Sequence, residues 1–131
     1  MSALAEIASR AAADSPLWAA SLRAGDPPGP RFAGACPDDY LLGVEMIYEA
    51  YLLHYETSRL FRQDDGELSL LTGDYLYAAG LVEICRTGDL AAVAALADLI
   101  SHCARNRGDG DGAADEALWR STVGLLGRPG P

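Results

Sequence analysis

Three neighbouring carboxylates are the residues of this sequence best suited to hold a metal ion. Asp64, Asp65 and Glu67 lie within four positions of one another, and carboxylate oxygens are the ligands that Mg²⁺ and Ca²⁺ prefer. Residues 62–67 form a polar break between two apolar segments, and an acidic residue at the start of a helix is favourable in itself. We therefore interpret this cluster as a solvated turn, with a metal site as the weaker alternative.

A second acidic stretch, near the C-terminus, has features of a calcium-binding loop. Asp109 and Asp111 are separated by one residue, and Gly112 follows them. If Gly112 takes the place of the glycine that an EF-hand loop requires, Arg107 stands at the first ligand position and Leu118 at the last. Neither side chain binds calcium, so the sequence excludes an EF-hand at this point.

No histidine or cysteine has the neighbours that acid–base or nucleophilic catalysis needs. His54 and His102 each stand without a nucleophile or a second metal ligand at helical spacing. The cysteines are odd in number and contain no C-x-x-C pair, which disfavours a disulfide framework or a zinc site: Cys36, Cys85 and Cys103. We expect no catalytic residue and no cofactor.

The overall composition is that of one soluble helical domain. Half of the 131 residues are hydrophobic, which suffices for one core and gives no sign of a second. The net charge is −9 and the ten basic residues are scattered arginines, so nucleic acid is not an expected partner. The N-terminus lacks the pattern of a signal peptide, and no eighteen-residue segment is free of charge. We expect a cytoplasmic protein without a transmembrane segment.

Apolar residues recur with helical periodicity along most of the chain, and no strand pattern of comparable strength occurs. The predicted fold class is therefore all-α, a bundle of about six helices. We expect residues 1–37 to hold two short helices and an arm rich in proline and glycine, and residues 38–131 to form the helical core of the same domain. The expected helices are residues 3–13, a second from Pro16 towards Gly25, then 38–61, 68–85, 90–103 and 114–126.

The longest expected helix, residues 38–61, has two sides of different character. Apolar and aromatic residues recur at helical spacing along one side: Tyr40, Val44, Ile47, Tyr51, His54 and Phe61. Charged side chains lie on another side: Glu45, Glu49, Glu56 and Arg59. The polar residues 62–67 would then end the helix.

The following helix, residues 68–85, carries a glycine and a carboxylate side by side near its middle. Asp74 falls in an apolar stripe of this helix, which comprises Leu70, Leu71, Ala78, Leu81 and Cys85. A glycine in a helix interior costs up to ~1 kcal/mol relative to alanine, and an unpaired buried carboxylate costs more. We infer that Gly73 and Gly80 let a neighbouring helix approach closely. Asp74 has either a partner on a facing element or a solvated place at the edge of the stripe.

Residues 70–77, L-L-T-G-D-Y-L-Y, together with the T-G-D turn that follows, resemble a segment of the trans-polyprenyl diphosphate synthases that reads V-L-A-G-D-Y-L. The matching positions, in order and without gaps, are Leu71, Gly73, Asp74, Tyr75, Leu76, Gly88 and Asp89. Upstream, a family helix that ends in L-L-H-D-D-x-x-D is matched at Glu45, Leu52, Leu53 and His54. A third, weaker match near the end retains Thr122, Leu125 and Leu126. The resemblance covers residues 45–126 and implies part of the isoprenoid synthase fold.

The residues that perform the chemistry of that family have no counterpart in this sequence. Those enzymes ionise an allylic diphosphate with magnesium ions that two aspartate-rich motifs hold. Where the resemblance puts the first motif, the sequence reads Tyr55, Glu56, Thr57, Ser58 and Arg59. One carboxylate remains there, and an arginine replaces the last ligand. The second motif would lie beyond residue 131, and the chain contains no lysine for the diphosphate-binding positions of the family.

This pattern of matches and losses resembles the small, non-catalytic subunit of heteromeric polyprenyl diphosphate synthases. The resemblance implies an accessory subunit that binds a catalytic synthase subunit and influences its activity and product chain length. The helices at residues 38–61 and 68–85 would form the interface. The candidate packing and interface residues are Gly73, Asp74, Tyr75, Tyr48, Tyr51, Tyr55 and His54, with Tyr77 as a further aromatic candidate; core packing is the alternative for the tyrosines.

Two other functions stay open. The chain would be a free-standing homodimeric enzyme acting on an isoprenoid diphosphate if it borrowed catalytic groups across its interface. It would be an unrelated helical protein-interaction module if its G-D-Y-L helix matched by chance.

Overall fold

Helix α3 (Asp38–Tyr55) is the most buried helix of the described residues and contributes to both hydrophobic core clusters. The computed structural model describes residues 1–128, in which six α-helices and one short 3₁₀ helix occur and no β-strand. The predicted all-α class is therefore confirmed. Every residue of α3 from Gly43 to Leu53 is buried, because the helix has neighbours on both sides.

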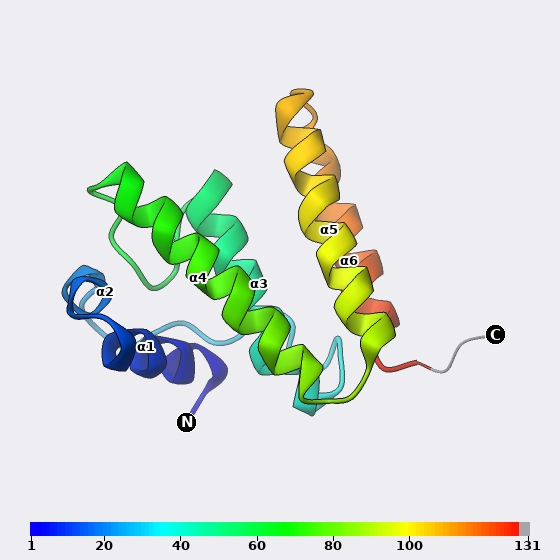
Figure 1. Cartoon of the computed structure of the whole chain (residues 1–131), viewed down its shortest axis with the longest axis horizontal. Helices are drawn as coiled ribbons and strands as arrows, with labels where there is room; N and C mark the ends of the chain where they lie inside the picture. Colours follow the sequence, from blue (N-terminus) through cyan, green and yellow to red (C-terminus); the bar gives the residue numbers. More distant parts are fainter. Residues whose placement is uncertain (129–131) are drawn as a thin grey trace.

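Helix α4 (Gly66–Cys85) lies alongside α3, and the two share the most extensive contact in the molecule (Figure 1). Their backbones meet at two glycines. A Cβ atom on Gly80 would lie 2.9 Å from the Gly43 carbonyl oxygen and 2.6 Å from Ile47 Cγ1. A Cβ on Gly43 would lie 2.9 Å from the Gly80 carbonyl oxygen. The close helix approach inferred from Gly80 is thus present, and Gly43 is its counterpart on α3.

Helices α5 (Leu90–Gly108) and α6 (Asp115–Leu125) form a second pair, which diverges from α3 and α4 in Figure 1. The 3₁₀ helix η1 (Gly112–Ala114) joins them. Trp119 and Val123 of α6 pack with Leu96 and Leu99 of α5 against α3. Helix α5 continues five residues beyond its predicted end at residue 103, so that Arg105 and Arg107 lie in its last turn, where cations are favourable.

The N-terminal helices α1 (Ala3–Asp14) and α2 (Pro16–Ser21) pack beside α3 and α4. The side chains of Ser2 and Ser15 accept hydrogen bonds from backbone amides at the two helix starts, as N-cap residues do. Helix α2 ends at Ser21, before the predicted stop at Gly25. The residue after it, Leu22, forms an isolated antiparallel bridge with Phe61, so extended pairing replaces the last helical turn.

The predicted end of the central helix at residue 61 is wrong, because α3 ends at Tyr55. Residues 56–65 leave the helix and run back along it as an irregular segment. The amide of Arg23 donates to the Leu60 carbonyl at 2.8 Å, and the amide of Arg62 donates to the Ser21 carbonyl at 2.7 Å. Phe61 is buried as expected, but from an extended segment rather than from a helix.

Candidate functional site

One face of α4 exposes large apolar side chains to solvent. Leu70, Leu71 and Val82 have 48%, 61% and 54% of their surface exposed, and Ala78 and Cys85 of the same face are exposed as well. The spacing of these residues puts them on one side of the helix. This face contains most of the stripe that the sequence pattern predicts through Asp74, except that Leu81 of the stripe is only partly exposed.

The buried face of α4 is built largely of small residues: Ser69, Thr72, Gly73 and Gly80, with Leu76 and Ile84 as its large side chains. Small residues are needed there because the backbone of α3 lies against them. Helix α4 therefore has two faces without lysine or arginine, the small-residue face that α3 covers and the exposed face with Leu70, Leu71 and Val82. A helix that is apolar all round is typically buried on all sides.

The structure brings together His54, Gly73 and Asp74 of the predicted site. A Cβ on Gly73 would lie 2.7 Å from His54 Cδ2, so the missing side chain makes room for the imidazole. Nε2 of His54 lies 3.1 Å from Asp74 Oδ1, without the alignment of a hydrogen bond. The ring of Tyr77 stacks on that of His54 with centroids 5.1 Å apart. The Asp74 side chain is 68% exposed. This agrees with the alternative in which its carboxylate is solvated at the edge of the stripe.

The five candidate tyrosines occupy three environments. Tyr48 and Tyr51 are buried, and their rings lie within 5.6 Å of the ring of Trp119. Tyr75 stacks on Trp18 of α2 with centroids 4.2 Å apart and donates a hydrogen bond to Asp14. Tyr55 and Tyr77 are partly buried beside the core. In this chain Tyr48 and Tyr51 are core residues, and Tyr75 fixes the N-terminal helices to α4.

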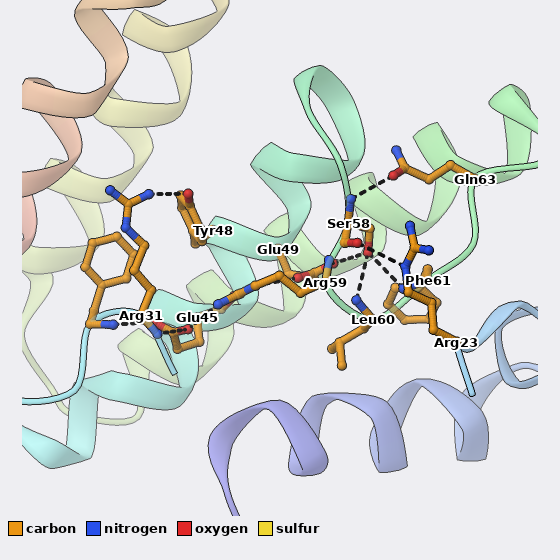
Figure 2. A network of polar contacts seen from close by, with 11 residues as sticks. Arg23, Arg31, Glu45, Tyr48, Glu49, Ser58, Arg59, Leu60, Phe61 and Gln63 are labelled. Carbon is orange, nitrogen blue, oxygen red and sulfur yellow. Dashed lines mark hydrogen bonds and ion pairs between the residues drawn. The ribbon is translucent and has the colours of Figure 1, made fainter. Parts of the chain in front are cut away.

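A buried polar network lies along α3 (Figure 2). Glu45 and Glu49 are completely buried although the sequence pattern sets them apart from the apolar side. The guanidinium of Arg59 donates to Glu45 Oε1 at 2.7 Å and to Glu49 Oε1 at 2.9 Å. The hydroxyl of Ser58 also donates to Glu49.

The same network fixes the proline- and glycine-rich arm. The backbone amides of Arg31 and Phe32 donate to the two oxygens of Glu45, each at 3.0 Å (Figure 2). The ring of Phe32 is buried against Tyr48 and Trp119. As predicted, residues 25–37 contain no helix or strand, yet the two buried carboxylate oxygens hold the arm against α3.

A cavity of about 420 Å³ lies between the end of α3, the end of α5 and the start of α6. Its walls include Tyr48, Tyr51 and Trp119, with Arg31 and Arg107 at its sides. Both guanidinium groups have partners. Arg31 contacts Glu116 at 2.5 Å, and Arg107 contacts Glu56 at 2.5 Å and Asp115 at 2.9 Å. An anionic ligand would therefore have to displace carboxylates to reach either arginine.

The buried carboxylate of Asp115 lies beside this cavity and accepts three hydrogen bonds. It accepts hydrogen bonds from Tyr51 Oη at 2.7 Å, Asn106 Nδ2 at 3.0 Å and Arg107 Nε at 2.9 Å. Burial raises the pKa of this carboxyl group, but the three donors lower the pKa by more, so that it lies below its ordinary value. Burial and the bond to Asp115 raise the pKa of the Tyr51 hydroxyl. This cluster joins α3, α5 and α6.

The described residues contain no group of three or more His, Cys, Asp or Glu side chains able to hold a metal ion. Asp65 of the weaker metal alternative caps α4, because its Oδ1 accepts hydrogen bonds from the amides of Glu67 and Leu68. Asp64 lies 4.0 Å from Arg62. These positions agree with the interpretation of the cluster as a turn.

No protein-family model, curated protein or solved structure matches the chain. Helix α4 is long and apolar enough to span a membrane by length and composition. A core helix of a soluble protein passes the same test, and one third of the apolar window of α4 is buried in this structure. The remaining observation that bears on function is the exposed apolar face of α4.

Proposed function

We propose that this protein is a non-catalytic subunit that binds a second protein through the exposed face of α4. The resemblance described above implies that the partner is a catalytic polyprenyl diphosphate synthase subunit, whose activity and product chain length the complex would change. The alternatives are a free-standing enzyme acting on an isoprenoid diphosphate and an unrelated interaction module.

The observation that carries this proposal is the unpaired apolar face of α4. Three of the seven exposed large hydrophobic side chains of the described residues lie on it: Leu70, Leu71 and Val82. Exposed apolar side chains gathered on one face of a protein mark an interaction site. Burying one such leucine or valine in an interface removes it from water, which favours association by roughly 1.5–3 kcal/mol for a complete burial.

A second observation concerns the residues aligned with the first aspartate-rich motif of the synthases. Ser58 and Arg59 direct their polar groups towards Glu49 and Glu45 inside the protein. A group that is already saturated by a buried partner is not free to bind a magnesium diphosphate. These contacts support a role in structure, rather than in catalysis, for this segment.

Co-expression with a full-length polyprenyl diphosphate synthase from the same genome tests the proposal. We expect the two chains to co-purify as a stable complex whose products differ in chain length from those of the synthase alone. Magnesium-dependent turnover of allylic diphosphates by this chain alone would favour the enzyme alternative. The absence of both a complex and turnover would favour the unrelated module.

A further inference from the structure

We propose that Asp74 receives a lysine or arginine side chain of the partner at the centre of the exposed α4 face. The partner surface would then be apolar with one cation at a fixed position. This inference rests on the proposed function, and it specifies the chemistry of the surface that α4 recognises.

The position of Asp74 sets the requirement for a cation. Leu70 and Leu71 lie one turn before it on the exposed face, and Ala78 lies one turn after it. Association through these apolar residues would remove water from the carboxylate between them. A carboxylate that loses its hydration without gaining a partner opposes binding strongly.

The protein itself leaves this carboxylate available. Within residues 1–128 the only cationic or titratable nitrogen near Asp74 is Nε2 of His54, at 3.1 Å and poorly aligned. The arginine residues nearest in the sequence are used elsewhere or lie off this face: Arg62 is near Asp64, and Arg86 is near Glu83. A partner side chain can therefore approach Asp74 from the solvent.

The charge of α4 favours a basic partner. Its twenty residues include Glu67, Asp74 and Glu83 but no lysine or arginine, and the whole chain has a net charge of −9. Complementary charge across an interface fixes its register and excludes wrong partners. An apolar surface with a lysine or arginine would match the apolar side chains of this face and the negative charge of Asp74.

A second copy of the chain is a poor occupant for the same reason. In a two-fold dimer through antiparallel α4 helices centred between Leu70 and Val82, the axis would pass at the level of residue 76 along the helix. Asp74 is two residues from that level, so the two carboxylates would lie about four residues apart along the helix axes, ~6 Å. Like charges at that distance in an apolar interface repel each other. We therefore assign the face to a different protein.

Isothermal titration of the purified chain with the purified synthase tests the assignment. We expect Asp74→Asn to weaken binding about tenfold or more, because the partner's cation loses its counter-charge. The matched control is Asp98→Asn, which removes the same charge from an exposed position of α5 and should change the affinity less than about twofold. Far-UV circular dichroism and thermal melting verify that both variants are folded.

Charge reversal identifies the partner residue. Asp74→Arg should bind the wild-type synthase still more weakly, and a synthase in which the facing lysine or arginine is replaced by glutamate should restore binding to this variant alone. Equal affinities of wild type and Asp74→Asn would overturn the inference while the proposed function stood. Failure of the wild-type chain to bind would overturn both. A dimer of the chain alone that Leu71→Glu dissociates in analytical ultracentrifugation would overturn the choice of a different protein as occupant.

Discussion

At the scale of single residues, the absence of a side chain matters as much as the presence of one. Gly80 lets the α4 backbone reach that of α3, because an added Cβ would overlap Ile47 Cγ1 and the Gly43 carbonyl oxygen. The carbonyl belongs to a helix and cannot rotate away. A small-to-large change at this point must separate the two helices.

We predict that Gly80→Ala lowers the free energy of unfolding by about 1–3 kcal/mol, the usual cost of overpacking a core. The matched control is Gly124→Ala in α6, where an added Cβ has no atom within 4 Å. This change should stabilise the protein by up to about 1 kcal/mol through helix propensity. Urea unfolding measures both, and equal effects of the two variants would contradict the close contact.

Arg59 is the second residue whose removal should be costly. It is the cation paired with two carboxylates that have no exposure to water, Glu45 and Glu49. Arg59→Ala should destabilise the protein by about 3–5 kcal/mol, because uncompensated charges remain buried. Arg120→Ala, which removes an exposed pair with Glu116 on α6, should cost less than about 1 kcal/mol. Chemical denaturation of both variants in the same buffer compares their losses of unfolding free energy.

At the scale of helices, the sequence predicts the starts of elements better than their ends. Local caps such as Ser15 and Asp65 begin α2 and α4 within two residues of the expected positions. The end of α3 has no such local signal. The chain leaves the helix there because Ser58 and Arg59 bind the buried carboxylates of Glu45 and Glu49. The periodicity of apolar residues contains no information about this pairing.

The face of α4 illustrates a second limit of sequence patterns. The periodicity locates the stripe through Asp74 correctly, but it does not tell which of two apolar faces is covered by the protein's own core. The deciding signal is the pair of glycines on the covered face: Gly80 meets Gly43 of α3, and Gly73 meets His54. Backbone contact between helices requires small residues, so the face with larger side chains is left outside.

The cluster that joins α3, α5 and α6 makes stability depend on pH. Asp115 has a pKa below its ordinary value because the donors Asn106, Tyr51 and Arg107 outweigh the effect of burial. Such a carboxylate contributes stability that is present above its unfolded pKa of ~3.9. This stability is lost as the pH falls through the folded pKa.

Asp115→Asn should therefore lower the free energy of unfolding at pH 7 by about 1–3 kcal/mol. The variant should also lose less stability than the wild type between about pH 5 and pH 2, since it has no proton to take up at this site. Tyr51→Phe, which removes one of the donors, should give an intermediate acid dependence. Urea titrations at several pH values test this, and parallel acid profiles of all three proteins would contradict it.

At the scale of the whole molecule, the fold separates a covered core from the uncovered apolar face of α4. Leu76 of α4 is fully buried, whereas Leu71 of the same helix is 61% exposed. Leu76→Ala should destabilise the isolated chain by about 2–5 kcal/mol. A polar change at Leu71 should alter its stability by no more than about 0.5 kcal/mol. A change at Leu76 therefore tests the stability of the fold, and a change at Leu71 tests binding without altering that stability.

The measurement that tests the central claim most directly is a pull-down of the full-length synthase by wild-type chain and by Leu71→Glu, with the stability of each chain measured in parallel. If the exposed α4 face is the interface, the wild-type chain retains the synthase and Leu71→Glu does not. Both variants should unfold at the same urea concentration. Retention of the synthase by the folded Leu71→Glu variant would contradict the assignment of this face as the interface.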